Sequence, residues 1–231
     1  MLNFNFPVFR RAFKNTIPVL TGYLMLGFGF GVLLVSHQFP LWLAPFMSLT
    51  IYAGALQYLS VEMLANHTDY FTIAVTTFLV NARHLFYGIS LIEKYKRIYL
   101  PKIYLAFGLT DETYSLIACN PTENESKEYY IYVTFLDHLY WISGGFLGAV
   151  FGKILPFNSD GIDFVLTALF IAIFTEQWLN TDKHFSAVIG ILATLICLIA
   201  FDKNYFLIPS MVLITLAIIW ARRFEIRRTK S

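Results

Sequence analysis

Long apolar runs with few charges dominate the pattern of residues along the chain. Residues Asn15 to Val61, for example, include no Asp, Glu, Lys or Arg. As a helix, about 20 apolar residues cross the roughly 30 Å hydrocarbon layer of a bilayer. Eight candidate segments follow one another: Ile17–Ser36, Pro40–Leu64, Tyr70–Ile92, Ile103–Cys119, Tyr129–Gly152, Phe164–Leu179, Phe185–Phe201 and Tyr205–Ala221. The pattern predicts an all-α, polytopic membrane protein with seven or eight apolar segments.

The composition supports a membrane location, with 57% hydrophobic and only 14% charged residues. A soluble domain of 231 residues must face water and cannot bury so much apolar surface in one core. No stretch is left for a separate soluble domain, so we interpret residues 1–231 as one transmembrane domain. The formal net charge of +2 does not suggest binding to nucleic acid. Cys119 and Cys197 lack ligand spacing and predict neither a disulfide nor a metal site.

The distribution of basic residues predicts an orientation and also a conflict. Basic residues lie in both terminal regions, 1–16 and 222–231, which places both termini in the cytoplasm by the positive-inside rule. Four more follow the third segment: Lys94, Lys96, Arg97 and Lys102. If every segment crossed the membrane once, the loop after the third segment would lie on the side of the membrane opposite to the N-terminus. We therefore expect at least one of the second and fourth segments to be broken or re-entrant, with Gly54 marking the break in the second.

Glycine-rich stretches suggest close helix packing and an internal repeat. Gly27, Gly29 and Gly31 precede Pro40 and an apolar segment, and a similar order recurs later with Gly144, Gly145, Gly148, Gly152 and Pro156. Many secondary transporters are built from such repeats. Glycines four residues apart also let two helices approach closely, and we expect this role for the stripe at positions 144, 148 and 152.

Two acids make the fourth segment unable to face lipid. Its apolar residues favour insertion by roughly 2–4 kcal/mol in total, whereas Asp111 and Glu112 near its centre oppose insertion by about 5–7 kcal/mol. The segment must be shielded by other helices, be discontinuous, or line a wet cavity. An interfacial helix whose acids reach water is the alternative.

The third segment carries Asn81, Arg83 and His84. Arg83 lies too deep to reach the headgroups easily and needs a carboxylate partner, so we expect an ion pair with Asp111 or Glu112. That pair would be structural or would contact a substrate. His84 is a packing residue or, beside Arg83, a proton carrier, because its ordinary pKa lies near neutrality.

Further polar and aromatic residues have less specific interpretations. Gln57 follows the suspected break at Gly54 and would contact a polar ligand or form an interhelical hydrogen bond. Four polar residues near expected segment ends are interpreted as solvated at the membrane interface: Asp137, His138, Glu176 and Gln177. Trp141 and Trp178 are interpreted as part of an aromatic belt.

Three short strings resemble the AzlC family, known from azaleucine resistance and branched-chain amino-acid export. They are Tyr52-Ala-Gly-Ala-Leu-Gln57, Asn81-Ala-Arg-His-Leu-Phe-Tyr87 and Leu109-Thr-Asp-Glu-Thr113. The resemblance covers most of the chain up to about Trp178. It implies a permease subunit of the bacterial plasma (inner) membrane that exports leucine, isoleucine, valine and analogues. Such a subunit usually acts with a small, separately encoded AzlD-type membrane protein.

The mechanism expected from these residues is secondary transport coupled to protons, without a cofactor. The chain has no phosphate-binding glycine loop of an ATPase. We expect the substrate at Gly54, Gln57, Asn81 and Arg83, and proton coupling at His84, Asp111 and Glu112. Two alternatives stay open. One is an intramembrane enzyme that uses the last three residues, although no H-E-x-x-H spacing supports it. The other is an assembly subunit without its own transport path.

Overall fold

The structure is a computed structural model, and its described residues fall into two compact units. Unit 1 comprises residues 1–68 and 80–169, and unit 2 comprises residues 69–79 and 170–231. The described residues are 4–95, 98, 101–118, 126–154, 171, 174–175, 178–179, 184–201, 206, 209–210 and 212–220. Every regular element that these residues form is a helix, which confirms the predicted all-α class. The interpretation of residues 1–231 as one domain stays a prediction.

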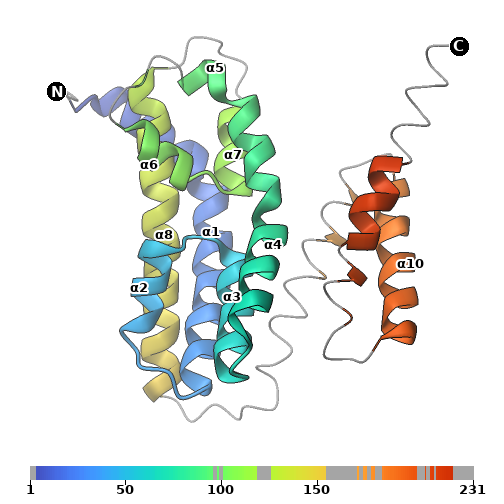
Figure 1. The fold of residues 1–231 in the computed structure, drawn as a ribbon. Helices are drawn as coiled ribbons and strands as arrows, with labels where there is room; N and C mark the ends of the chain where they lie inside the picture. Colours follow the sequence, from blue (N-terminus) through green and yellow to red (C-terminus); the bar gives the residue numbers. More distant parts are fainter. Residues whose placement is uncertain are drawn as a thin grey trace, which may run out of the picture. The chain divides into compact units, whose positions relative to one another are not determined.

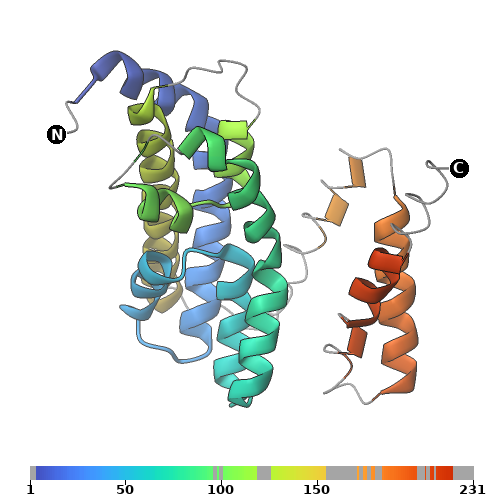
Figure 2. The ribbon, with the colours of Figure 1, turned by 45° about the horizontal axis from the view of Figure 1, so that its top comes forward.

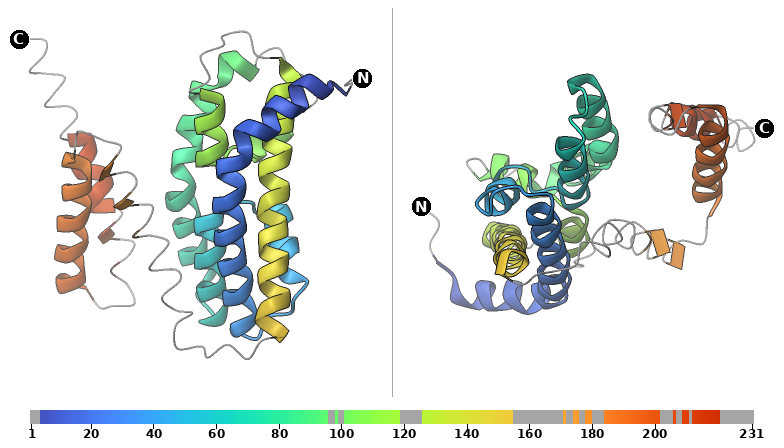
Figure 3. Two further views of the ribbon diagram at one scale, coloured as in Figure 1. Left: turned by 180° about the vertical axis from the view of Figure 1, so that it is seen from behind. Right: turned by 90° about the horizontal axis from the view of Figure 1, so that it is seen from below.

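The core of unit 1 is the contact between helices α1 (Phe6–Ser36) and α8 (Lys127–Ile154). Figures 1 and 3 show the two helices side by side. Glycines make this approach close. A Cβ on Gly31 would overlap the backbone at Gly145, and a Cβ on Gly148 would overlap the backbone of Phe28. The predicted role of the glycine stripe in close helix contact is confirmed within the chain.

Helix α1 begins with local signals that the sequence supplies. The side chain of Asn5 caps it by accepting a hydrogen bond from the N–H of Val8 at 3.4 Å, and a proline occupies the first turn. Pro18 lies inside the helix, and Figure 3 shows α1 bending along its first half. Among the described helices, α1 is the one that is long and apolar enough to cross a bilayer. The predicted total of seven or eight segments stays a prediction.

The second predicted segment is broken. It forms α2 (Leu43–Thr50) and α3 (Gly54–Ala65), separated by residues 51–53. Tyr52 has a φ of 45°, a left-handed conformation that bulky residues rarely adopt and that stops α2 from continuing. Figure 1 shows α2 and α3 running in opposite directions, so the pair forms a hairpin.

The fourth predicted segment is broken as well. It forms α6 (Lys102–Phe107) and α7 (Asp111–Ala118), with residues 108–110 between them. Figures 1 and 2 show a second hairpin, which opens toward the end of unit 1 opposite to the first. A Cβ on Gly108 would overlap the side chain of Thr134 on α8, so a glycine is needed where the chain turns. The expectation that at least one of the two segments is discontinuous is confirmed for both.

The two hairpins remove the charge conflict along the sequence. Each returns the chain to the end of unit 1 from which it started, so helices α4 (Tyr70–Ser90) and α5 (Ile92–Tyr95) bring the chain back to the end where α1 begins. Lys94 donates to the carbonyl of Ile117, 2.6 Å away, at the C-terminus of α7. Lys94 therefore lies at the same end of unit 1 as the start of α1, which carries Arg10 and Arg11. The cytoplasmic location of that end stays a prediction.

Unit 2 contains the first half of α4 and helix α10 (Phe185–Ala200), and residues 212–220 are also helical. Its helix α10 matches the predicted segment Phe185–Phe201, and Cys197 is buried there as a free thiol. Several predictions concern positions outside the described residues: Cys119, Lys96, Arg97, most of Phe164–Leu179 including Glu176 and Gln177, and the basic region 222–231. Pro156 also lies outside the described residues, whereas the glycines of the second half of the suggested repeat lie in α8.

Candidate functional site

The two helix breaks meet on the middle of α8. The ring of Tyr52, from the first break, lies 4.2 Å from the ring of His138 and 6.1 Å from that of Phe107. Phe107 precedes the second break and also contacts His138, at 5.8 Å between ring centroids. We call this region the helix-break junction: residues 51–54 and 108–113 with Tyr23 of α1 and Asp137, His138 and Trp141 of α8.

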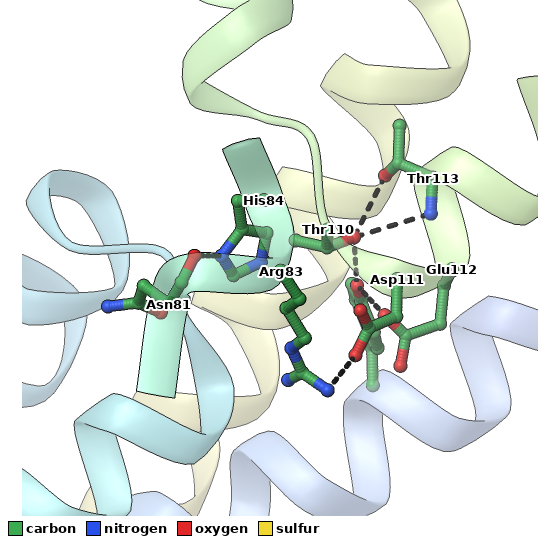
Figure 4. A network of polar contacts seen from close by, with 8 residues as sticks. Asn81, Arg83, His84, Thr110, Asp111, Glu112 and Thr113 are labelled. Carbon is green, nitrogen blue, oxygen red and sulfur yellow. Dashed lines mark hydrogen bonds and ion pairs between the residues drawn. The ribbon is translucent and has the colours of Figure 1, made fainter. Parts of the chain in front are cut away.

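Arg83 and Asp111 form an ion pair beside the junction. Arg83 Nη1 lies 2.8 Å from Asp111 Oδ2, and Figure 4 shows the guanidinium of α4 reaching the start of α7. The side chains are 32% and 34% exposed, so the pair is accessible from outside the core. Asp111 is the first residue of α7, where the helix dipole favours a negative charge. The predicted pairing of Arg83 with one of the two acids is confirmed.

Glu112 faces a different environment from its neighbour because successive helical residues point about 100° apart. The hydroxyl of Tyr23 donates to Glu112 Oε2 at 2.7 Å and also lies 2.6 Å from Thr110 Oγ1. Thr110 in turn accepts from the N–H of Thr113 at 3.3 Å, and their hydroxyls are 3.1 Å apart (Figure 4). The Tyr23 hydroxyl therefore connects Glu112 to the hydroxyl groups of Thr110 and Thr113.

Asp137 and His138 are buried, so their interpretation as interfacial residues is wrong. Asp137 is 0% exposed, and its Oδ2 accepts from Thr113 Oγ1 at 2.9 Å. His138 Nε2 lies 3.1 Å from the carbonyl of Ser48, and its Nδ1 lies 3.2 Å from the hydroxyl of Tyr104. Asp137 lies ten residues after the start of α8, about 15 Å along the helix axis, which is too deep for solvation at an interface.

Gln57 and Trp141 hold the first break in place. Gln57 is fully buried; its Oε1 accepts from the indole N–H of Trp141 at 2.8 Å, and its Nε2 donates to Ser48 Oγ at 3.3 Å. These bonds join α2, α3 and α8. Trp141 is 3% exposed, so its interpretation as part of an aromatic belt is wrong. Its ring also explains the glycine at position 54, because a Cβ there would lie 2.9 Å from the indole.

The remaining predicted site residues lie at partly exposed positions. Helix α3 begins at Gly54 without a side-chain cap, and its first N–H groups have no acceptor within the helix. Asn81 is half-buried on α4, and His84 Nδ1 lies 3.2 Å from the Asn81 carbonyl (Figure 4). The structure thus brings Arg83 to Asp111 but keeps His84 in contact with its own helix. Among the described residues, no three His, Cys, Asp or Glu side chains gather as a metal site.

Sequence reasoning missed the residues that connect the acids. Tyr23, Thr110 and Thr113 are common in apolar helices, and no spacing marks them as partners. Thr110 carries one weak signal, because a hydroxyl residue immediately before Asp111-Glu112 is typical of a helix start. That signal indicates a break in the fourth segment but does not indicate contacts with α1 or α8.

Comparisons with known proteins identify the family. Residues 18–155 match the family described as AzlC protein. The chain belongs to the AzlC family. It is 41% identical to the branched-chain amino acid transport protein AzlC of Bacillus subtilis (strain 168), over 89% of this chain and 82% of that protein. No solved structure matches the chain.

Other relatives of the chain are named as membrane proteins. An uncharacterized membrane protein of Helicobacter pylori (strain ATCC 700392 / 26695) is 38% identical over 93% of this chain and 95% of the relative. Inner membrane protein YgaZ of Escherichia coli (strain K12) is 31% identical, with 71% of each chain covered. These names agree with the predicted membrane location. The AzlC match begins at Pro18 and ends in the residue after α8, so it includes the whole helix-break junction.

Proposed function

We propose that this AzlC-family protein exports branched-chain amino acids across a bacterial inner membrane by proton-coupled secondary transport. The observation that carries the proposal is the junction itself: two helix hairpins from opposite ends of unit 1 meet there, next to the Arg83–Asp111 pair. Broken helices that meet in this way form the substrate sites of many secondary transporters. The relative of Bacillus subtilis, named as a branched-chain amino acid transport protein, supports the substrate class.

The start of α3 suits the carboxylate of an amino acid. A zwitterionic substrate needs donors for its carboxylate, an acceptor for its ammonium group and an apolar pocket for its side chain. The uncapped N–H groups at Gly54 supply donors, and the helix dipole favours an anion there. Residues 53–55 are partly exposed and so can be reached. Gln57 supports this site from behind, because both ends of its buried amide are engaged by Trp141 and Ser48.

The substrate's other contacts come from α4 and α7 in this proposal. The side-chain oxygen of Asn81 accepts from the ammonium group. Arg83 exchanges its bond to Asp111 for the substrate carboxylate at one stage of the cycle, which its partial exposure permits. Release of Asp111 from Arg83 then couples substrate binding to the proton-carrying groups. The candidates for these groups are Asp111, Glu112 and His84. Arg83 contributes more than a structural charge in this scheme, because its partner changes during transport.

Orientation and partner complete the proposal. The end of unit 1 with Arg10, Arg11 and Lys94 faces the cytoplasm, since the positive-inside rule concerns basic residues beside spans. A small AzlD-type membrane subunit assembles with this chain in the bilayer. Co-expression with a neighbouring AzlD-like reading frame, followed by purification through a tag on one subunit, tests the assembly directly.

A counterflow assay tests the transport function. Liposomes that contain the purified protein, with and without the AzlD-type subunit, are loaded with unlabelled leucine and diluted into labelled leucine. We expect transient accumulation of label that excess valine or isoleucine suppresses and excess lysine does not. Arg83→Gln should abolish it, whereas Lys127→Gln, which removes an exposed charge at the start of α8, should not. Folded protein without counterflow in either preparation would contradict the proposal.

A further inference from the structure

Five oxygen atoms form a continuous chain through the helix-break junction. Glu112 Oε2 lies 2.7 Å from the Tyr23 hydroxyl, which lies 2.6 Å from Thr110 Oγ1. Thr110 Oγ1 lies 3.1 Å from Thr113 Oγ1, which lies 2.9 Å from Asp137 Oδ2. All four separations are hydrogen-bond distances. We call this row of atoms the hydroxyl chain, and it connects a carboxyl group of α7 with one of α8.

The four contacts of the hydroxyl chain need one more hydrogen than its three hydroxyl groups carry. Each of the three hydroxyl groups has one hydrogen to donate, and an ionised carboxylate has none. The four contacts of the hydroxyl chain each need one hydrogen. If Glu112 and Asp137 were both ionised, two oxygens would face one another at hydrogen-bond distance with only lone pairs between them. The backbone N–H of Thr113 cannot supply the missing hydrogen, because it donates from outside the row to Thr110.

We propose that Glu112 and Asp137 share one proton through the hydroxyl chain and that this pair is the proton-carrying site. In one arrangement protonated Glu112 donates to Tyr23, and the hydroxyls donate onward to ionised Asp137. In the other, protonated Asp137 donates to Thr113, and all the bonds point the opposite way. Passing from one to the other moves one proton from Glu112 to Asp137. Each hydroxyl accepts one hydrogen and gives one away, so Tyr23 and both threonines end unchanged.

The surroundings of Asp137 distinguish it from Asp111, and also from Glu112, which has Arg83 and Asp111 among its charged neighbours. Asp111 has the guanidinium of Arg83 beside it, which compensates its negative charge. Asp137 has no such partner among the described residues: its titratable neighbours besides Glu112 are tyrosines, namely Tyr23, Tyr52, Tyr104 and Tyr140. The neighbouring ring of His138 is satisfied in its neutral form, with Nε2–H donating to Ser48 and Nδ1 accepting from Tyr104. A buried carboxylate without a cation is costly, and a shared proton limits the buried charge to one.

The role of the shared proton in transport rests on the proposed function. The presence of the shared proton does not depend on any substrate. Infrared spectroscopy therefore tests it separately. Purified protein in lipid at neutral pH should show the C=O stretching band of a protonated carboxylic acid, shifted in D2O. Asp111→Asn should retain this band, and the double variant Glu112→Gln/Asp137→Asn should lose it. A wild-type spectrum without the band, or a band unchanged in the double variant, would overturn the shared proton.

Transport measurements test the path of the proton. Tyr23→Phe removes one hydroxyl from the hydroxyl chain. Tyr140→Phe is its matched control, because the Tyr140 hydroxyl also makes a buried contact that involves α1, 3.2 Å from Thr16 Oγ1. We expect Tyr23→Phe to lower leucine transport driven by a pH gradient at least about tenfold. Leucine exchange at equal pH should stay within about twofold of wild type, since exchange needs no net proton movement. Tyr140→Phe should change neither rate by more than this.

Two further results separate the inference from the proposed function. Thr113→Val interrupts the chain with a side chain of similar shape and serves in place of Tyr23→Phe if that variant does not fold. Gradient-driven leucine transport that persists in a folded Tyr23→Phe or Thr113→Val variant would overturn the proposed proton path through the hydroxyl chain. Wild-type protein that shows the infrared band but transports no leucine would contradict the proposed function and leave the shared proton standing.

Discussion

The two hairpins of unit 1 solve the same backbone problem with different chemistry. Each interrupts an apolar segment at a glycine-containing turn, 51–54 in α2–α3 and 108–110 in α6–α7. Each glycine is held against a side chain of α8: Gly54 against Trp141 and Gly108 against Thr134. The long helices α1 and α8 thus form a scaffold to which both turns are attached.

The polar groups at the two breaks differ in charge. At the first break the bonds are neutral, from Gln57 to Trp141 and Ser48, and the start of α3 is left without a side-chain cap. At the second break, Thr110 accepts from the N–H of Thr113 at the start of α7, and two acids follow it. The first break therefore offers donors to an anion, whereas the second already contains anions.

This difference explains how one junction can perform two tasks. A neutral, tightly bonded break keeps its position whatever the protonation state of the surroundings. An acidic break changes its hydrogen bonds when a proton arrives or leaves. We interpret α2–α3 as the fixed half, which recognises the substrate, and α6–α7 as the half that responds to protons.

The largest expected effect concerns the neutral break. Trp141→Ala removes a buried ring and leaves the carbonyl of Gln57 without its donor, so we expect a loss of about 3–5 kcal/mol in the free energy of unfolding. Trp42→Ala is the control, because that ring is 61% exposed and its loss should cost less than about 1 kcal/mol. Thermal unfolding in lipid nanodiscs measures both. Similar losses in the two variants would show that the bond to Gln57 does not hold the break.

A smaller effect is expected from filling the two turns. Gly54→Ala places a methyl group 2.9 Å from the ring of Trp141, and Gly108→Ala overlaps Thr134; each should cost about 1–3 kcal/mol by overpacking. Gly22→Ala in α1 meets nothing within 4 Å and should stabilise the protein by about 0.5–1 kcal/mol. Thermal unfolding of the three variants gives the comparison. A neutral Gly54→Ala or Gly108→Ala would mean that the turn can move away from α8.

The sequence predicted that at least one of the two segments is broken, from the conflict in basic residues together with Gly54 and the two acids, and it predicted the ion pair because an unpaired charge in hydrocarbon is costly. Charged residues within apolar segments require partners or discontinuous helices, and Arg83, Asp111 and Glu112 are such residues. The sequence located the segment that contains Asp137 and Trp141 close to α8 (Lys127–Ile154), but it could not show that both side chains face other helices instead of water. Contacts between hydroxyl groups of distant helices depend on packing and have no sequence pattern. Tyr23 illustrates this limit.

A further prediction compares ion pairs of similar exposure, one at the acidic break and one on α3. Asp111→Asn frees Arg83 from its partner, so gradient-driven leucine transport should fall about tenfold or more, equal to about 1.4 kcal/mol in the barrier, while exchange continues. Glu62→Gln removes the pairing of Glu62 with His37, whose atoms are 3.7 Å apart, and should leave both rates unchanged. Transport assays in liposomes measure these rates. Equal losses of exchange and driven transport in Asp111→Asn would place this residue in substrate binding.

The smallest effect is expected at Asp69, a carboxylate that, like Asp111, lies at a helix start but is far more exposed. Hydrogen bonds from the hydroxyl of Thr72 and then from its N–H, 2.9 Å from Asp69 Oδ1, hold the pKa of Asp69 below its ordinary value. A carboxyl group whose pKa is lowered in the folded state stabilises that state when the pH is above the pKa of the unfolded state, about 3.9. This contribution is lost as the pH falls through the pKa of the folded state. Asp69→Ala should therefore lower the melting temperature slightly at pH 7, and the difference from wild type should shrink below about pH 4. Melting curves of both proteins between neutral and acid pH measure this difference. A gap that stays constant with pH would show that the ionised form of Asp69 does not stabilise the start of α4.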